Sequence, residues 1–222
     1  MSVGLKPIKR ALVSVFYKDG LEPLLRKLAS LGVELLSTGG THAYIEALGL
    51  HATKVESLTG YPSILGGRVK TLHPAVFGGI LQRADEPQDV QDAAHHAIAA
   101  IDLVIVNLYP FEQTVESGAA EAEVIEKIDI GGVALIRAGA KNFANVTTLS
   151  GPEQYPELVD ILDERGAATT LEERKVFAFD AFGATTAYDN AIAEYFFEQL
   201  SAAGAIELED EDELETDRKS VV

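Results

Sequence analysis

The chain has 222 residues, of which 47% are hydrophobic, so it is long enough and apolar enough to bury the core of one sizeable domain. It contains no cysteine, which excludes a disulfide framework and any metal site built on thiolates. Its formal net charge of −17 opposes nonspecific binding to nucleic acid, although a locally basic pocket can still accept an anionic small molecule.

The predicted elements alternate between strands and helices from the N-terminus onward. Residues 10–16 form an apolar run typical of a buried strand, and residues 21–31 carry the i, i+3, i+4 apolar stripe of a helix. A second strand over 33–36 leads through the sequence STGGT into a helix over 41–48. The remaining predicted elements are a helix over 89–101, the strongest strand over 102–108, a short helix over 133–140, a strand over 145–149, a helix over 152–164, and one long helix over 171–200 or two helices joined near Gly183.

This order of elements predicts an α/β fold. Strands that alternate with helices form βαβ units, and such units give a mostly parallel, Rossmann-like central sheet with helices on both faces. In sheets of this kind a ligand binds at the carboxyl ends of the strands. We expect one domain over residues 1–204. Residues 205–222 should form an acidic disordered tail or the start of a linker, because eight of the 35 acidic residues fall between 207 and 217.

The sequence offers no targeting or membrane-spanning segment. The apolar run over 11–16 is too short for a signal peptide, and no run approaches the roughly 20 apolar residues of a membrane span. We therefore expect a soluble, cytoplasmic protein whose partners include neither a membrane nor nucleic acid.

The first candidate site is the glycine loop, residues 37–41, which joins the second strand to its helix. Glycines let the backbone approach a ligand, and the helix that follows directs free N–H groups at it. The hydroxyls of Ser37, Thr38 and Thr41 add donors. These features fit a phosphate-binding loop, and an ordinary strand-to-helix turn with a threonine cap is the alternative.

A second loop, residues 66–74, combines two glycines with Arg68, Lys70, Thr71 and His73. Arginine offers phosphate a planar fork of donors, and lysine offers a compact charge. In so acidic a chain, two cations beside glycines indicate an anion site, with a solvated loop as the alternative. We expect His73 to be structural rather than catalytic. No other His or carboxylate stands at the spacing of a metal site.

Two further segments place polar residues beside predicted elements. Asn107 and Tyr109 directly follow the strongest strand, where they can reach a ligand, although Tyr109 could instead be a packing residue. Asp129 precedes a glycine pair and a helix, so helix capping is the alternative to a role in the site. Lys141 follows twelve residues later, beyond the far end of that helix, and spacing alone does not bring it near Asp129.

Taken together, the strings STGGT, GGRVKTLHPA, NLYPF, IDIGG and AKN resemble, in this order and spacing, the IMP cyclohydrolase domain that forms the N-terminal half of a bifunctional purine biosynthesis enzyme. The resemblance covers residues 10 to about 200 and implies a three-layer domain of the methylglyoxal-synthase-like type. It implies closure of FAICAR to IMP with loss of water, without a metal or a cofactor. Its candidate partners are a second copy of the chain and a formyltransferase domain or subunit, which these residues do not contain.

Carried over position by position, the resemblance also implies roles for individual residues. Lys70 would steady developing negative charge and Tyr109 would donate a hydroxyl near the formyl oxygen. Asp129 would hold the carboxamide and Lys141 would transfer a proton, although the division of acid and base among Lys141, Asp129 and Tyr109 stays open. The residues implied to contact the substrate are Phe16, Tyr17, Lys18, Thr38, Gly39, Gly40, Thr41, Arg68, Val69, Thr71, Val106, Asn107 and Ile130.

The chain departs from the family pattern in its first loop. That loop often reads Ser-Asp-Lys-Thr-Gly, and here residues 16–20 read Phe-Tyr-Lys-Asp-Gly. The side-chain hydroxyl at Phe16 is lost, so any contact there must come from the backbone.

Two other functions remain open at this stage. A lyase resembling methylglyoxal synthase needs carboxylates close to the glycine loop, and none is obvious there. A nucleotide- or phosphate-sensing module without catalysis gives Lys70, Tyr109, Asp129 and Lys141 no reason to occur together.

Overall fold

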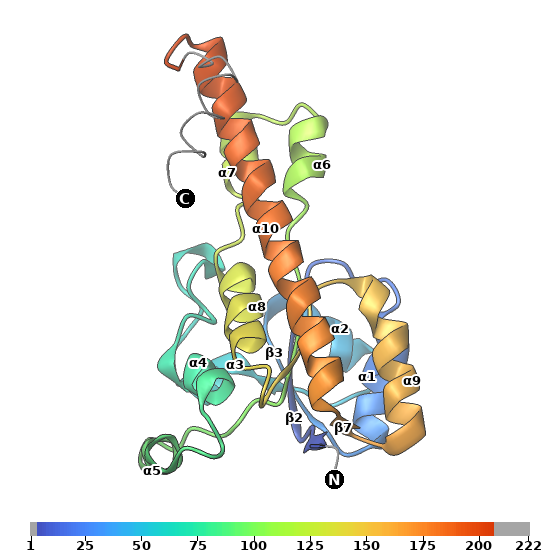
Figure 1. The fold of residues 1–222 in the computed structure, drawn as a ribbon. Coiled ribbons are helices and arrows are strands. Elements are labelled where there is room, and N and C mark those ends of the chain that lie inside the picture. Colours follow the sequence, from blue (N-terminus) through green and yellow to red (C-terminus); the bar gives the residue numbers. More distant parts are fainter. Residues whose placement is uncertain (1–3, 207–222) are drawn as a thin grey trace, which may run out of the picture.

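The computed structural model describes residues 4–206, and Figure 1 shows how its elements are arranged. Five strands form one parallel sheet in the order β4-β3-β2-β5-β6. Two short strands, β1 and β7, pair antiparallel beside it. The strands are β1 (Lys6–Pro7), β2 (Arg10–Val15), β3 (Glu34–Ser37), β4 (Thr53–Lys54), β5 (Leu103–Asn107), β6 (Thr147–Leu149) and β7 (Ala168–Thr169).

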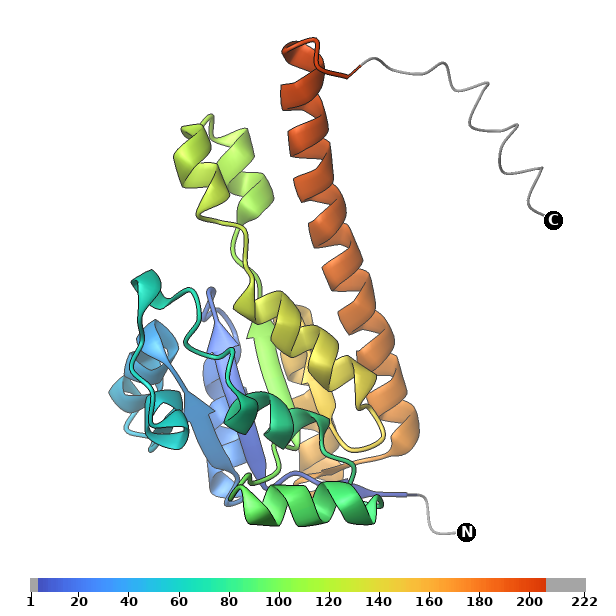
Figure 2. The same cartoon turned by 90° about the vertical axis from the view of Figure 1, so that its left-hand side faces the viewer.

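Helices cover both faces of the sheet and make a three-layer architecture (Figures 1 and 2). α1, α2 and α9 contribute to the core on one face, and α4 and α8 to the core on the other, while α10 packs along β6 and α8. The α-helices are α1 (Leu21–Ser30), α2 (Gly39–Ala47), α3 (Val55–Thr59), α4 (Pro74–Leu81), α5 (Pro87–His95), α6 (Phe111–Glu116), α7 (Glu121–Ile125), α8 (Gly131–Lys141), α9 (Tyr155–Arg165) and α10 (Leu171–Ala202), with 3₁₀ turns η1 (Leu65–Gly67) and η2 (Pro152–Gln154).

The central strands send alternate side chains to the two faces. Val13 and Ile105 belong to one core cluster, whereas Leu12, Val104 and Val106 belong to the other. Successive side chains of a strand point to opposite faces, and here both faces are covered by helices. A strand buried on both sides reads as an unbroken apolar run, which is why β2 and β5 stand out in the sequence. The predicted α/β fold with a parallel central sheet is confirmed.

The predicted helix over 89–101 is wrong in its second half. The structure ends α5 at His95, and Ala97 adopts a left-handed φ of 53° just beyond it. Ile98 and Ile101 do not continue a helical stripe, because their side chains pack closely on the glycines of α4. Gly79 in particular leaves no room for a Cβ beside Ile101.

The predicted long C-terminal helix is one continuous element, and it does not break near Gly183. A reciprocal capping box begins α10: the Glu173 N–H donates to Thr170 Oγ1 at 3.2 Å, and the Thr170 N–H donates to Glu173 Oε2 at 2.8 Å. Figure 2 shows that the upper part of α10 rises beyond the sheet and runs beside α6 and α7.

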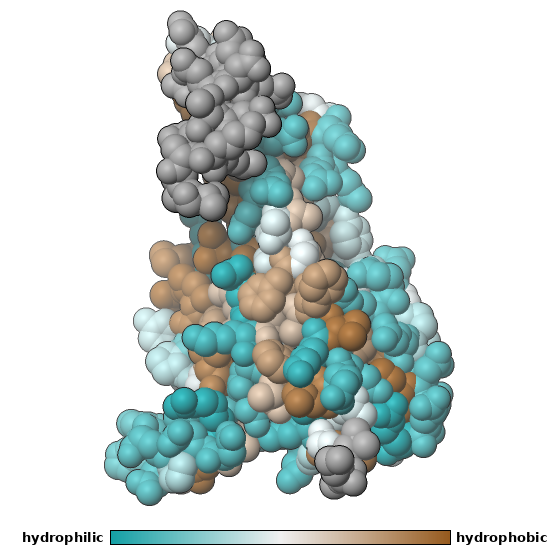
Figure 3. Space-filling model, in the orientation of Figure 1, coloured by the Kyte–Doolittle hydropathy of each residue, from teal (hydrophilic) through white to brown (hydrophobic). Residues whose placement is uncertain are grey.

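The N-terminal part of α10 exposes apolar side chains, which gather on the face seen in Figure 3. Val176 is 53% exposed and Phe179 is 79% exposed. The Arg137 guanidinium on α8 lies 5.6 Å from the ring centroid of Phe182 and partly covers it.

The structure also contains elements that the sequence did not predict, among them α3, α4, α6 and α7. α6 and α7 are held on α10 by a third apolar cluster that includes Phe111, Val124, Tyr188 and Tyr195. None of the helices in the described part of the chain combines the length and apolarity that crossing a bilayer requires. The predicted acidic tail falls, from residue 207 onward, outside the described residues.

Two helical glycines provide a test of this packing. A Cβ at Gly139 in α8 would overlap the buried Thr148 side chain of β6, whereas Gly183 in α10 has no atom within 4 Å of its Cβ position. We predict that Gly139→Ala lowers the free energy of unfolding by about 1–3 kcal/mol. Gly183→Ala should raise it by up to about 1 kcal/mol, because alanine is the better helix former.

Urea unfolding of both variants measures the two shifts side by side. Adding Thr148→Ala to Gly139→Ala should recover most of the loss, since it removes the overlapping atoms. A Gly139→Ala variant that is as stable as the unaltered chain would contradict the close approach of α8 to β6.

Candidate active site

A cavity of about 680 Å³ opens where β3, β2 and β5 end. Val13 pairs with Ser37, and Val15 pairs with Asn107, so the carboxyl ends of these three strands lie at the same edge of the sheet. The chain leaves each strand there, as expected for a ligand site in a parallel sheet. The cavity brings together these predicted site residues: Phe16, Lys18, Thr38, Gly40, Thr41, Arg68, Lys70, Thr71, Asn107, Tyr109, Asp129 and Ile130.

Other predicted site residues do not line this cavity. The Tyr17 hydroxyl donates to Gln113 Oε1 on α6 at 2.6 Å, so this side chain turns outward. Val106 is buried in the core, and Val69 is half-buried beside the cavity. Lys141 is exposed at the last residue of α8, a helix of 11 residues whose first residues line the cavity. A helix of that length spans about 16 Å, so the structure does not bring Lys141 to the other catalytic candidates.

The hydroxyls of the glycine loop are already hydrogen-bonded within the protein. Because these hydroxyl protons are used within the protein, the donors that remain for an incoming anion are the first backbone N–H groups of α2. The predicted contact of Thr38 and Thr41 with a substrate stays a prediction, and in this structure the hydroxyl protons point at other groups of the protein. Ser37 Oγ donates to the Val13 carbonyl at 2.8 Å, Thr38 Oγ1 to Glu56 Oε1 at 2.8 Å, and Thr41 Oγ1 to the Val15 carbonyl at 2.9 Å.

Glu56 brings a carboxylate to the glycine loop, where the sequence showed none. It is half-buried on α3 and accepts the hydroxyl proton of Thr38. The two positions are 18 apart in the chain, with a helix and a strand between them, and no local pattern links them. The expectation that no carboxylate lies near the loop is wrong.

Two lysines place positive charge beside the N-terminus of α2. Lys18 Nζ donates to the carbonyls of Val15 and Phe16 at 3.0 and 2.6 Å, and burial lowers the pKa of this ammonium group. The Lys70 ammonium lies 3.2 Å from the Cβ position of Gly39 and so stands against the glycine loop. Two cations and a helix N-terminus together form an environment suited to a phosphate.

A third cation has a carboxylate partner across the mouth of the cavity. Arg68 forms an ion pair with Glu126, and both side chains are mostly exposed. Arg68 follows Leu65, Gly66 and Gly67, which all have left-handed φ values. Such a run of positive φ angles requires glycine at most positions and gives the loop its tight turn.

The Asp129 carboxyl accepts a hydrogen bond from the first turn of α8 and lines the cavity, whereas the N-cap residue of α8 is Ile130. The Gly132 N–H donates to Asp129 Oδ1 at 2.7 Å, and a Cβ at Gly132 would overlap this carboxylate. Burial raises the pKa of the Asp129 carboxyl, opposed by hydrogen bonds from the amides of Gly132 and Tyr109 and by the charge of Lys70. The sequence Asp-Ile-Gly-Gly therefore holds a poorly solvated carboxyl group against a helix end.

Tyr109 and Phe16 form an aromatic wall of the cavity. Their ring centroids lie 5.5 Å apart in an edge-to-face arrangement, and the Lys127 ammonium lies 5.5 Å from the Phe16 ring centroid. Burial, followed by the charge of Asp129, raises the pKa of the Tyr109 phenol. Tyr109 thus keeps its proton and can donate a hydrogen bond into the cavity.

The Asn107 side chain fixes the first loop instead of pointing at a ligand. Its Oδ1 accepts from the N–H groups of Phe16 and Tyr17 at 2.5 and 3.1 Å. Its Nδ2 donates to the Tyr17 carbonyl at 2.9 Å and to the Tyr155 hydroxyl at 3.3 Å. All the hydrogen bonds of this amide in the structure are thus made within the protein, although Asn107 also lines the cavity.

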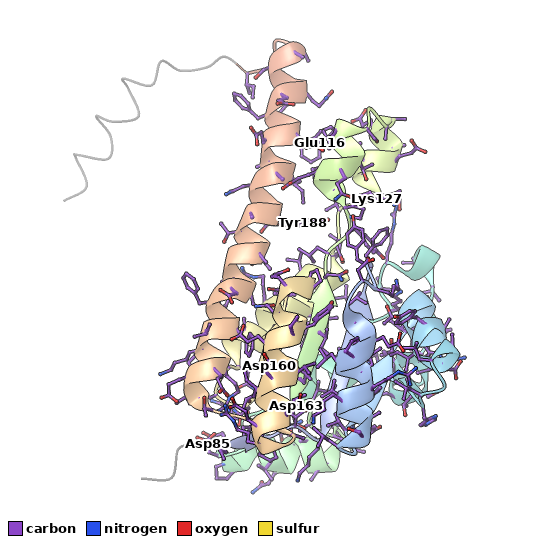
Figure 4. All side chains as sticks on the ribbon, turned by 90° about the vertical axis from the view of Figure 1, so that its right-hand side faces the viewer. Asp85, Glu116, Lys127, Asp160, Asp163 and Tyr188 are labelled. Atoms are coloured by element: carbon purple, nitrogen blue, oxygen red, sulfur yellow. The ribbon has the colours of Figure 1, made fainter. Side chains whose placement is uncertain are left out.

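The segment over 125–128 lines the cavity just before Asp129, and the sequence motifs did not predict it as part of the site. It contributes Glu126 and Lys127, and Figure 4 labels Lys127 on the stretch between α7 and α8. These residues read as an ordinary amphipathic stretch. The one available signal was their position immediately before the Asp-Ile-Gly-Gly motif.

The parallel sheet, the glycine loop at its carboxyl edge and the cavity beyond it define an MGS-like domain. The family model described as "MGS-like domain" matches residues 20–134, and the model described as "AICARFT/IMPCHase bienzyme" matches residues 139–219. The chain belongs to the MGS-like family, and its C-terminal part matches the AICARFT/IMPCHase model. The resemblance drawn from its sequence motifs is confirmed.

Relatives named bifunctional purine biosynthesis protein PurH match most of this chain. The protein from Bacteroides thetaiotaomicron is 58% identical over 191 residues, which are 86% of this chain and 38% of that protein. The protein from Rhodospirillum rubrum is 50% identical over 194 residues, 87% of this chain and 37% of that protein. The chain thus spans less than two fifths of these relatives. A solved structure titled "Crystal structure of ForH" is 36% identical, with a TM-score of 0.74 over 85% of this chain and 99% of that chain.

The raised pKa of Asp129 predicts how its replacement changes stability with pH. The folded state holds the proton of this carboxyl more tightly than the unfolded state, whose pKa is near 3.8. Stability from this group is therefore greatest below that value and falls as pH rises through the folded pKa. We predict that Asp129→Asn, which keeps an acceptor for the Gly132 N–H, raises the free energy of unfolding at pH 7.5.

Urea unfolding of both proteins at pH 7.5 and pH 4 provides the measurement. The advantage of Asp129→Asn should shrink at pH 4, because the raised pKa leaves more of the native carboxyl protonated there than at pH 7.5. An unchanged difference between the two pH values would mean that the carboxylate is well solvated in the folded chain.

Proposed function

We propose that the chain is an IMP cyclohydrolase, which closes FAICAR to IMP with loss of water in the last step of de novo purine biosynthesis. The observation that carries the proposal is the meeting of Lys70, Tyr109 and Asp129 in one cavity with the glycine loop. The names of the relatives support a place in purine biosynthesis. We further propose a cytoplasmic enzyme, a homodimer, and a formyltransferase unit as the partner that supplies the formylated substrate.

The phosphate of the nucleotide would bind at the glycine loop. The free N–H groups at the start of α2 point toward it, and the ammonium groups of Lys18 and Lys70 lie alongside. Arg68 would join them once it leaves Glu126. These contacts are equally available to the substrate, the transition state and the product, so they set affinity rather than turnover.

The reacting groups would then lie near Asp129 and Tyr109. Asp129 takes a proton from the carboxamide nitrogen as this nitrogen attacks the formyl carbon. The Tyr109 hydroxyl and the Lys70 ammonium stabilise the negative charge that develops on the formyl oxygen. The raised pKa of Asp129 makes it a stronger base than a solvated carboxylate.

The carbinolamine formed in this step then loses water. The formyl oxygen became this hydroxyl by taking up the equivalent of the proton that the carboxamide nitrogen released. The hydroxyl leaves as water with a second proton from Tyr109 or Lys70, and the formamide nitrogen gives up its own N–H proton, which restores that group. The carboxamide and formamide nitrogens thus lose one proton each, and both protons depart with the formyl oxygen as water, which balances the reaction. Lys141 takes no step in this scheme, because it lies at the opposite end of α8.

A lyase resembling methylglyoxal synthase is the second candidate, and Glu56 is the observation that favours it. This carboxylate contacts the glycine loop through Thr38, and Asp129 supplies another in the same cavity. A lyase of this type acts on a small triose phosphate, whereas the cavity has a volume of about 680 Å³, enough for a whole nucleotide.

The decisive experiment is incubation of the purified chain with FAICAR while IMP formation is followed by ultraviolet absorbance. We predict turnover well above the rate without enzyme, and a loss of roughly 10²–10⁴-fold in Asp129→Asn. Parallel incubation with dihydroxyacetone phosphate tests the lyase. Release of inorganic phosphate without formation of IMP would establish the lyase. If neither inorganic phosphate nor IMP is formed, the remaining interpretation is a binding module without catalysis.

Substitutions at the two ends of the cavity should separate binding from chemistry. Lys18→Ala is predicted mainly to raise KM, whereas Tyr109→Phe is predicted mainly to lower kcat. A double variant of Tyr109 and Asp129 should lose much less than the product of the single losses, because the two groups act as a unit. Steady-state kinetics with FAICAR measures all three.

Lys141→Ala tests the role that the family resemblance implies. In the scheme proposed here it keeps turnover close to that of the unaltered chain. A loss as large as that of Asp129→Asn would show that Lys141 reaches the substrate in an arrangement that this single chain does not provide.

A further inference from the structure

Tyr188 on α10 holds the backbone that carries Asp129. Its hydroxyl donates to the Lys127 carbonyl at 2.5 Å and accepts from the Asp129 N–H at 3.0 Å. One phenolic oxygen therefore joins both sides of Ile128. Figure 4 labels Tyr188 on α10 and Lys127 on the facing segment, at about the same level of the molecule.

These two hydrogen bonds tie to α10 a stretch whose other backbone bonds are local turns, from the Lys127 N–H to the Val124 carbonyl at 2.9 Å and from the Ile128 N–H to the Ile125 carbonyl at 3.1 Å. The segment over 127–129 links α7 to α8 and belongs to neither helix. The Asp129 carboxylate is held by the Gly132 N–H, while its backbone N–H is held by Tyr188. Asp129 is thus fixed at both ends, and the loss of either contact would let the carboxyl shift in the cavity.

The Tyr188 ring is itself well anchored. It is 8% exposed within the apolar cluster of α6, α7 and α10, and its centroid lies 6.1 Å from that of Phe111 in an edge-to-face arrangement. Burial raises the pKa of the Tyr188 hydroxyl to about 12, so it stays protonated and able to donate at neutral pH. A tyrosine held in this way can keep the segment over 127–129 at a fixed position relative to α10.

We propose that Tyr188 is a positioning residue for the reaction: acting through the backbone of residues 127–129, it places the Asp129 carboxyl and the Lys127 ammonium in the cavity without touching the substrate. The kinetic consequence of this inference rests on the proposed function. The positioning of Asp129 by Tyr188 does not depend on that function. α10 thereby becomes part of the site, although the described residues of the cavity lining come from other elements.

The chain offers a matched pair of variants. Tyr188→Phe removes one hydroxyl and keeps the ring. Tyr195→Phe makes the same change on the same helix, in a side chain that is also buried and packs on the same Phe111 at 5.8 Å, but that makes no hydrogen bond to residues 127–129. The pair separates the effect on the segment from the general effect of losing a buried hydroxyl.

We expect Tyr188→Phe to lower kcat for FAICAR by about 10–100-fold, because a small misplacement of a reacting group is costly. Its KM should stay within about threefold, since the phosphate end is untouched. Tyr195→Phe should stay within about twofold of the unaltered chain in both constants. Equal effects of the two substitutions would overturn the positioning role.

A second readout does not depend on activity. The pKa of the Asp129 carboxyl can be followed by carbon-13 NMR, with Asp129→Asn to assign its signal. Lys70 and Tyr109 face this carboxyl, and neither changes between the two variants. Tyr188→Phe should move the pKa of Asp129 down toward its ordinary value, because the freed segment admits water, and Tyr195→Phe should leave it unchanged.

The outcomes separate this inference from the proposed function. A shifted Asp129 pKa in a chain that forms no IMP would support the hold by Tyr188 and reject the cyclohydrolase. An active enzyme whose Tyr188→Phe variant keeps both its kcat and the Asp129 pKa would reject the hold alone. If Tyr188→Phe does not fold, amide hydrogen exchange in the unaltered chain decides: slow exchange at the Asp129 N–H is expected, and fast exchange overturns the proposal.

Discussion

The side-chain amide of Asn107 is the contact on which the shape of the cavity depends. It bonds to the backbone of Phe16 and Tyr17 and so continues the pairing of β2 with β5 beyond the last residues of both strands. The first loop, which includes Lys18, is thereby fixed relative to Tyr109. A buried amide left without partners costs about 1–3 kcal/mol, so the loop and Asn107 hold each other in place.

The parts of the fold and site that could be predicted from the sequence are those whose residues follow one another in a local pattern, such as an apolar run, a helical stripe or a short motif. β2 and β5 are buried on both faces and read as apolar runs, and α1 shows its buried stripe directly. The glycine loop and Lys70 lie within short motifs whose composition alone indicates an anion site. The predicted helix over 89–101 is too long because Ile98 and Ile101 match the spacing of a helical stripe, whereas in the structure they follow the helix and pack on α4.

The parts that could not be predicted depend on contacts between distant segments. No sequence pattern near Thr38 indicates that Glu56 contacts it. Likewise, nothing in the sequence of α10 distinguishes Tyr188, which bonds to Asp129, from Tyr195, which does not. The hydrogen bonds of Asn107 were equally hidden, because an amide after a strand suits a ligand as well as a loop. Lys141 shows the opposite case, a motif residue that helix geometry separates from its expected partners.

The strand order also has a consequence for how the chain acquires its structure. β2 lies between β3 and β5, so one of its edges is paired early, while the other waits until β5 has been synthesised. Pairings between residues far apart in the chain close slowly, because a long loop must first be ordered. During translation the exposed edge of β2 is an open template for strands of other chains. The edge of β2 that pairs with β5 is therefore the part of this sheet that is open to wrong pairing until β5 is made.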